Sequence, residues 1–400
     1  MSFVFLVIVT VLFIWSPVIV LIAISLNGMN IFGEILQIVG IGEGGYFLIW
    51  VAALYMAIAA FIAGVFLKKS LINKAKFQKG IIAMLPWLLF TAYMWGRLLW
   101  GGTELSFGEY GVFKTFLFTA YSFSTIVILL IYYAFKGSRE VIGQIEIPLF
   151  IFGLIQALMI IYEGMQIAAV RVTVMDTNPL GLARNMGLGM IAAVGIINIK
   201  WLRILCIAVF ITGIIMTGSR GPLVAAAIVL FVYFFSGQLK SRQWRFLMPI
   251  SVVLLIPLLY FLFDYFLAEF FARGSTSFAE HGNVTGRMYL YETALNAFGA
   301  NPIFGIGVGQ YAEVALHDYP HNLILELLAE MGIVGLLLFI IALQPLTTLS
   351  FKNHYSMYVL FALISLMFST DLANAQILVV PSVLALIMMD KLGNEKGDTS

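Results

Sequence analysis

The stretch IIMTGSRGPLVAAAIVL, residues 214–230, sets Ser219, Arg220 and Gly221 between two strongly apolar runs. The apolar character resumes at once on the far side, as it does where a short turn joins two buried segments. A guanidinium is costly to bury in an apolar medium unless it is paired. The composition of the whole chain shows which medium surrounds these segments.

The composition is that of a membrane protein. Hydrophobic residues make up 62% of the 400 residues and charged residues only 10%, and the mean hydropathy is +1.02. These values exclude an ordinary water-soluble domain. In lipid, only helices satisfy their own backbone groups over long apolar runs, and a spanning helix needs about 20 apolar residues. The sequence therefore predicts an all-α polytopic membrane protein with about twelve transmembrane helices. The predicted spans are residues 3–25, 46–67, 81–100, 116–135, 147–166, 186–199, 202–216, 222–235, 247–270, 323–343, 355–370 and 376–389.

Lysine and arginine predict the orientation, because cytoplasmic loops carry an excess of both. The stretch KKSLINKAKFQK, residues 68–79, is the strongest such signal, and counting spans outward from it places both termini in the cytoplasm. The first span lacks a basic leader and a small-residue cleavage site, so we expect it to be retained. The single cysteine, Cys206, lies inside a span and excludes an internal disulfide framework. The basic residues that fall at or near the outer face are Arg97, Lys114, Arg171, Arg184, Arg220, Arg273 and Arg287.

The chain is expected to form a single integral membrane domain, residues 1–400. Its inner loops leave no room for a nucleotide-binding domain, and GIGVG at 305–309 is interpreted as a tight turn because it follows no βα unit. One long outer segment covers residues 271–321, and its loop lies between Arg273 and Pro320. Long loops are often functional. Within this loop, apolar residues at helical spacing predict an amphipathic helix on the outer membrane surface. These residues are Met288, Tyr291, Ala294, Leu295 and Phe298.

Arg220 is the outer cation with the clearest local setting. Pro222 suits the first turn of a helix, so the turn before it presents backbone N–H groups and a guanidinium together at a helix start. This arrangement suits an anion. The alternative is an arginine that only anchors two helix ends at the lipid headgroups. Lys114, Arg184 and Arg287 also admit two interpretations: an anion contact, or a structural role as an interfacial anchor or ion-pair partner.

The segment HDYPHNLILELLAEMGIVG, residues 317–335, supplies a second set of polar residues. His321 stands at the mouth of a span, and Asn322, Glu326 and Glu330 follow at intervals of four and so share one helix face. Glu330 would lie about 12 Å below Asn322, at a depth where carboxylates face a cavity or a partner. We expect structural pairing or protonation for Glu330.

His321 is the candidate base. The imidazole group has an ordinary pKa of about 6.5, which suits removal of a proton from an alcohol at neutral pH. The alternative for His321 is a capping or packing residue at the helix mouth.

In combination, these motifs resemble the O-antigen ligase and polymerase family of bacterial envelope proteins. The motifs, in chain order, are NPLGLAR at 178–184, TGSRGP at 217–222, GR followed by NPIFGIGVGQY within 286–311, and HNLILELLAEMGIVG at 321–335. The first half of the chain is similar only in hydropathy and in a YG…K pattern at Tyr110, Gly111 and Lys114.

The resemblance implies a fold like that of the C-type glycosyltransferases, which move a glycan from undecaprenyl diphosphate at the outer face of the bacterial inner membrane. It implies that Arg220 and Arg287 hold the diphosphate, with Arg184 and Lys114 as further contacts. His321 would serve the acceptor hydroxyl, supported by Ser219, Asn322 and Glu326. Such a reaction is expected to invert the anomeric centre and to require no cofactor and no metal, because guanidinium groups can stabilise the leaving diphosphate.

The expected partners are an undecaprenyl-diphosphate-linked oligosaccharide, an acceptor glycan or lipid A core, membrane lipids and a chain-length regulator protein, without nucleic acid. In family ligases a residue often separates the histidine from the asparagine-like position. Here Asn322 follows His321 directly, which favours a surface-polysaccharide polymerase over an O-antigen ligase. A transporter or flippase of lipid-linked glycans is the alternative of another class. Ionisable groups near the midplane would suit it, and Glu163, Asp264 and Glu330 keep it open.

Overall fold

The computed structural model describes residues 73–100, 109–136, 138–166, 179–236, 284–315, 317–343, 355–368, 372–379 and 382. Within these residues every regular element is helical and there is no strand, which confirms the all-helical class. Four described segments are long and apolar enough to cross a membrane: Lys74–Leu99, Ile145–Met165, Pro179–Ile196 and Leu323–Ala342. They fit an integral membrane protein. The predicted spans at 3–25, 46–67 and 247–270 lie outside the described residues, so the total number of spans stays a prediction.

The described residues form two compact units. Unit 1 falls within Met1–Pro148, Thr293–Thr348 and Asp371–Ser400, and unit 2 falls within Leu149–Glu292 and Leu349–Thr370. Helices α6 (Ser138–Gln166) and α12 (Val284–Ala300) contribute residues to both units. A single integral membrane domain stays a prediction.

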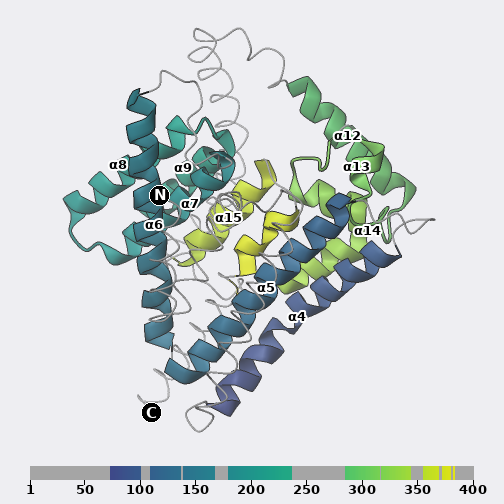
Figure 1. Cartoon of the computed structure of the whole chain (residues 1–400), viewed down its shortest axis with the longest axis horizontal. Helices are drawn as coiled ribbons and strands as arrows, with labels where there is room; N and C mark the ends of the chain where they lie inside the picture. Colours follow the sequence, from purple (N-terminus) through teal and green to yellow (C-terminus); the bar gives the residue numbers. More distant parts are fainter. Residues whose placement is uncertain are drawn as a thin grey trace, which may run out of the picture. The chain divides into compact units, whose positions relative to one another are not determined.

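Unit 1 is built on three helices, α4 (Lys74–Leu99), α5 (Glu109–Lys136) and α14 (Leu323–Ala342). Helix α4 packs against both α5 and α14, and the 3-10 helix η3 (Leu372–Leu378) contacts α5 (Figure 1). Four buried aromatic rings join the three long helices: Trp87, Phe90, Phe118 and Phe339. Phe90 lies 5.6 Å from Phe118 and 5.4 Å from Phe339 between ring centroids, in edge-to-face arrangements that aromatic pairs favour.

Unit 2 is arranged around α7 (Pro179–Ile196), which contacts α8 (Lys200–Met216), α9 (Arg220–Ser236) and α15 (Tyr355–Phe368) (Figure 1). Residues 182–194 of α7 are all buried. Small residues permit this close packing: a methyl group at Gly189 would lie 2.9 Å from the carbonyl oxygen of Leu149 on α6. Helix association in lipid depends on such contacts, because lipid tails are as apolar as the side chains.

Two helices begin earlier than hydropathy predicts. The predicted spans at 116–135 and 186–199 exclude Lys114 and Arg184, whereas α5 begins at Glu109 and α7 at Pro179, so both basic residues lie inside helices. Both side chains have polar partners within their own unit, so the helices continue past them. Residues 376–378 of the predicted span at 376–389 belong to the 3-10 helix Leu372–Leu378, and most of the remaining span lies outside the described residues, so this span stays a prediction.

Helix α12 confirms that residues in the long outer segment form a helix, and the residues of its predicted apolar face differ in burial. Ala294 is buried against Tyr311 and Ala329, whereas Met288 and Leu295 are 62% and 52% exposed. The partners of Ala294 decide which side of the helix faces inward, and hydropathy does not report those partners. Placement of α12 on the outer membrane surface stays a prediction.

Candidate functional site

His321 stands at the mouth of α14 in an unusual backbone conformation. Its φ angle is 58°, and it is the only residue other than glycine with a positive φ among the described residues. Asn322 is the N-cap of α14, and its Oδ1 accepts hydrogen bonds from the N–H groups of Ile324 (3.0 Å) and Leu325 (3.2 Å). The predicted position at the helix mouth is confirmed. Asn322, however, lies before the helix and caps it, so the face predicted for three residues is shared only by Glu326 and Glu330.

Two aromatic rings of unit 1 lie next to the His321 imidazole. The Tyr319 ring lies 4.6 Å from it between centroids, and the His317 ring lies 5.9 Å away. Tyr319 in turn stacks on Tyr110 of α5 at 6.2 Å with an interplanar angle of 17°. His321 is half-buried, whereas His317 is exposed. Sequence reasoning did not single out Tyr319, and its place two residues before His321 was the only available signal.

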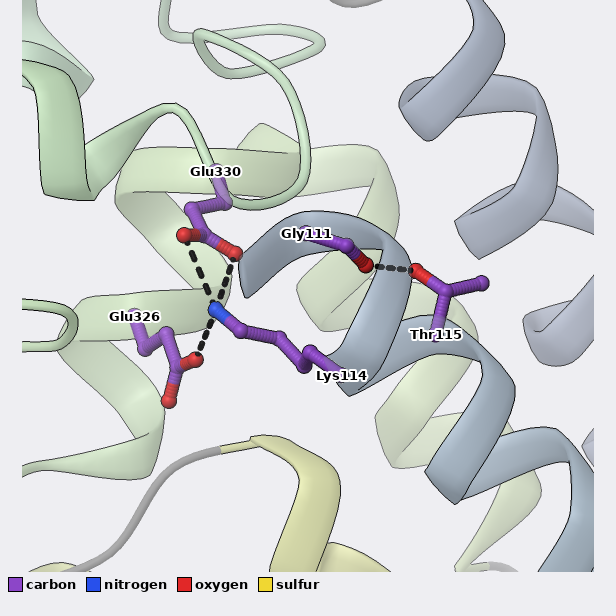
Figure 2. A network of polar contacts seen from close by, with 5 residues as sticks. All are labelled: Gly111, Lys114, Thr115, Glu326 and Glu330. Atoms are coloured by element: carbon purple, nitrogen blue, oxygen red, sulfur yellow. Dashed lines mark hydrogen bonds and ion pairs between the residues drawn. The ribbon is translucent and has the colours of Figure 1, made fainter. Parts of the chain in front are cut away.

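A buried ion cluster lies on α5 and α14, where the Lys114 ammonium meets two carboxylates (Figure 2). Lys114 Nζ donates to Glu326 Oε1 at 2.5 Å and to Glu330 Oε1 and Oε2 at 2.9 and 2.8 Å. All three side chains are fully buried. The expected structural pairing of Glu330 is therefore confirmed. An ion pair in such a place is kept by close geometry and by hydrogen bonds that satisfy the charges.

Helix α14 is broken at Gly332, whose φ of 64° and ψ of −166° are not helical. The predicted span at 323–343 was continuous, so the break is a correction. A break leaves backbone groups without partners inside the helix, which is costly in an apolar medium. Residues 302–307 supply those partners. The bonds run from Ile306 N–H to Ala329 O (2.8 Å), Gly307 N–H to Glu330 O (2.9 Å), Ile333 N–H to Pro302 O (2.9 Å) and Val334 N–H to Ile303 O (3.2 Å).

The glycine-rich segment at 305–309 is a turn, as predicted, and its glycines are required by its geometry. Gly305, Gly307 and Gly309 all have positive φ angles, which glycine adopts without steric cost. The turn packs against α5, because a methyl group at Gly111 would lie 2.7 Å from the carbonyl oxygen of Val308. Arg97 of α4 also holds it, donating from Nη2 to the carbonyl oxygen of Gly305 at 2.9 Å. The turn thus ties α14 to α4 and α5.

Arg220 begins α9 in unit 2, with Pro222 in the first turn as predicted. The chain reaches it through Gly218, which has a φ of 66°, and through buried Ser219. Thr217 Oγ1 accepts a hydrogen bond from the Ser219 N–H at 3.2 Å and stabilises this turn. The Arg220 side chain is half-buried.

The other predicted cations are distributed between the two units. Arg184 lies within α7, is 5% exposed, and donates from Nε to Ser365 Oγ at 3.2 Å in unit 2. Arg287 lies in α12, and its side chain is outside the described residues. Arg220 also belongs to unit 2, whereas His321 and Lys114 belong to unit 1. Their predicted roles as diphosphate contacts stay predictions.

Residues 204–340 match the family model described as O-antigen ligase. This match confirms the resemblance that the motifs of the second half indicate, and its range includes Arg220, Arg287 and His321. Lys114 and Arg184 lie outside the matched range. No match was found among curated proteins. The family match supports a membrane glycosyltransferase-like role in O-antigen or polysaccharide assembly.

Proposed function

We propose that the chain is a polymerase of a bacterial surface polysaccharide. It moves a glycan from undecaprenyl diphosphate to a sugar hydroxyl at the outer face of the inner membrane. The single observation that carries the proposal is the backbone of His321. A left-handed conformation costs a residue other than glycine about 1–3 kcal/mol. A histidine at this helix mouth is therefore best explained by a task of its side chain.

The proposed reaction is one displacement at the anomeric carbon. The acceptor oxygen forms the new glycosidic bond while the bond to the diphosphate breaks, so the anomeric configuration inverts. The proton of the acceptor hydroxyl passes to the His321 imidazole, and the electron pair leaves with undecaprenyl diphosphate. The donor already carries an energised bond, so the step needs no nucleotide.

Arg220 and Arg287 are proposed to hold the diphosphate, with Arg184 as a further contact. Guanidinium groups match phosphate oxygens with paired hydrogen bonds and keep their charge at all relevant pH values. These guanidinium groups would stabilise the negative charge that develops on the leaving diphosphate. Asn322 caps the helix start next to His321, and Ser219 directly precedes Arg220 at the start of α9.

Ligation to lipid A core is the second candidate, because the matching family model is described as O-antigen ligase and does not distinguish ligation from polymerisation. Purified protein supplied with lipid-linked repeats, with and without lipid A core, distinguishes the two. Chain lengthening without core supports the polymerase. Glycan transfer that requires core supports the ligase, and the absence of both products contradicts the proposal and favours a transporter.

The catalytic role of His321 is tested by separating binding from chemistry. His321→Asn should bind undecaprenyl diphosphate as well as the parent, while turnover falls by roughly 10²–10⁴. Turnover of the parent should also fall as acid protonates the imidazole, since a protonated ring cannot accept the hydroxyl proton. Arg220→Lys is the matched variant: it should weaken lipid binding, because a point charge cannot reproduce the paired contacts of a guanidinium. A binding titration and a transfer assay on the same preparations measure both. Normal transfer by His321→Asn would exclude His321 as the base.

A further inference from the structure

We infer that Lys114, Glu326 and Glu330 are positioning residues for the transfer step and act on His321 through Tyr110 and Tyr319. The inference rests on the proposed function, because it takes His321 as the base. It gives Lys114 a role other than contact with the diphosphate.

The Lys114 ammonium uses its hydrogen-bond donors on carboxylates and not on a phosphate. An ammonium group has three N–H donors and no acceptor. Three contacts join Lys114 Nζ to carboxylate oxygens, one to Glu326 and two to Glu330 (Figure 2). The donors are therefore fully used inside unit 1, and the side chain is 0% exposed. A phosphate would have to displace a carboxylate from this buried place to reach the ammonium.

A continuous series of contacts leads from this ammonium to the imidazole. Lys114 Nζ lies 4.9 Å from the centroid of the Tyr110 ring, within the range of a cation–π interaction. Tyr110 stacks on Tyr319 at 6.2 Å, and Tyr319 meets His321 edge to face at 4.6 Å. Each of these rings thus has a fixed neighbour on either side. The cluster determines where Tyr110 lies, and through Tyr319 it determines where the imidazole lies.

The backbone provides a second connection between the same elements. Glu330 binds Lys114 through its side chain and accepts the Gly307 N–H through its carbonyl oxygen at 2.9 Å. The turn that contains Gly307 packs on Gly111, one helical turn before Lys114. This turn precedes the segment that carries His321. The ion cluster thus joins α5 to α14, and the turn before His321 packs on both helices, so a change in the geometry of the cluster should shift the histidine.

The first experiment replaces the whole cluster, because removing one charge alone would leave the others buried without a partner. The triple variant Lys114→Met, Glu326→Gln, Glu330→Gln keeps the approximate shape and removes every charge. We expect its Kd for undecaprenyl diphosphate to stay within about twofold of the parent, while kcat falls roughly 10- to 100-fold through misplacement of the base. A tenfold weaker Kd would make Lys114 a diphosphate ligand and overturn the inference, as would an unchanged kcat.

The second experiment removes only the ring contact, and it stands even if the triple variant does not fold. Tyr319→Leu should lower kcat with little change in the KM for the lipid donor, and Tyr319→Phe, which keeps the ring, should restore most of the lost turnover. A purely structural role would lower the yield of folded protein and leave kcat per folded molecule unchanged. Full activity of Tyr319→Leu would therefore contradict the inference.

A double-mutant cycle separates the inference from the proposed function. If Tyr319 acts through His321, then Tyr319→Leu should cause no further loss of turnover in the His321→Asn background. If the two losses multiply instead, Tyr319 acts independently and the inference fails while the role of His321 stands. If His321→Asn alone transfers at the rate of the parent, the proposed role of His321 as the base fails, and the inference fails with it.

Discussion

Helices α9 in unit 2 and α14 in unit 1 begin with the same backbone pattern but carry different side chains. In each case a residue with a left-handed conformation lies two positions before the first helical residue. That residue is Gly218 before α9, with a φ of 66°, and His321 before α14, with a φ of 58°. Glycine is the residue that this conformation favours. The backbone requirement alone thus accounts for Gly218 but does not account for His321.

The two helix starts also differ in how they are supported. Asn322 caps α14 with two backbone hydrogen bonds, and the break further along that helix is filled by residues 302–307. At α9, Ser219 precedes the helix, but its Oγ has no hydrogen-bond partner among the residues that the structure describes. Gly221 instead allows close packing against Phe368, since a methyl group there would lie 2.7 Å from the Phe368 Cβ. The mouth of α14 thus has a side-chain cap on the helix itself, whereas the described support of α9 is the Thr217 hydrogen bond in the preceding turn and the packing at Gly221.

The largest expected difference in stability concerns two glycines, one on each helix. Gly332→Ala should lower the free energy of unfolding by about 3 kcal/mol or more, because its φ and ψ are accessible almost only to glycine. Its new methyl group would also lie 2.6 Å from the backbone nitrogen of Gly305. Gly221→Ala, the control on α9, should cost about 1 kcal/mol, because overpacking is offset by the higher helix propensity of alanine. Thermal unfolding in detergent measures both, and equal costs would mean that α14 tolerates a regular helix at the break.

The left-handed residues should respond in opposite directions. Gly218→Ala should lower the free energy of unfolding by about 1 kcal/mol or more. His321→Gly should leave it unchanged or raise it by up to about 1 kcal/mol, because relief of strain is partly offset by the entropy of the unfolded glycine. Transfer by His321→Gly should nevertheless fall by roughly 10²–10⁴. A clear loss of stability in this variant would identify His321 as a packing residue and remove the contrast between the two helix starts.

The caps give the smallest expected difference. Asn322→Ala should cost about 1 kcal/mol, the usual contribution of an N-cap that accepts two backbone bonds. Ser219→Ala should cost only a few tenths of a kcal/mol, consistent with most substitutions that break no specific interaction. Chemical or thermal unfolding of the two variants side by side provides the comparison. A cost for Ser219→Ala as large as that for Asn322→Ala would show that α9 depends on its serine as a cap.

The sequence by itself was sufficient to determine the class of the protein and several local features. Long apolar runs of this kind become helices in lipid, because a helix satisfies the hydrogen bonds of its backbone groups within the same segment. Local rules also placed Pro222 in the first turn of α9, the glycines at 305–309 in a tight turn, and Glu326 and Glu330 on one face of α14. Each of these results depends on residues close together in the chain, where spacing and conformational preference are enough.

Only the tertiary structure decided what these elements contact. Lys114 lies outside the predicted span at 116–135, but the structure places it inside α5, where its carboxylate partner Glu326, 212 residues later, folds against it. The break in α14 is possible only because residues 302–307 supply the backbone partners that the helix loses. The stacking of Tyr319 on Tyr110 joins positions 209 apart in the chain. Hydropathy and periodicity describe one segment at a time. A buried charge and the backbone groups freed at a helix break, in contrast, need partners, and those partners depend on which distant segment folds against them.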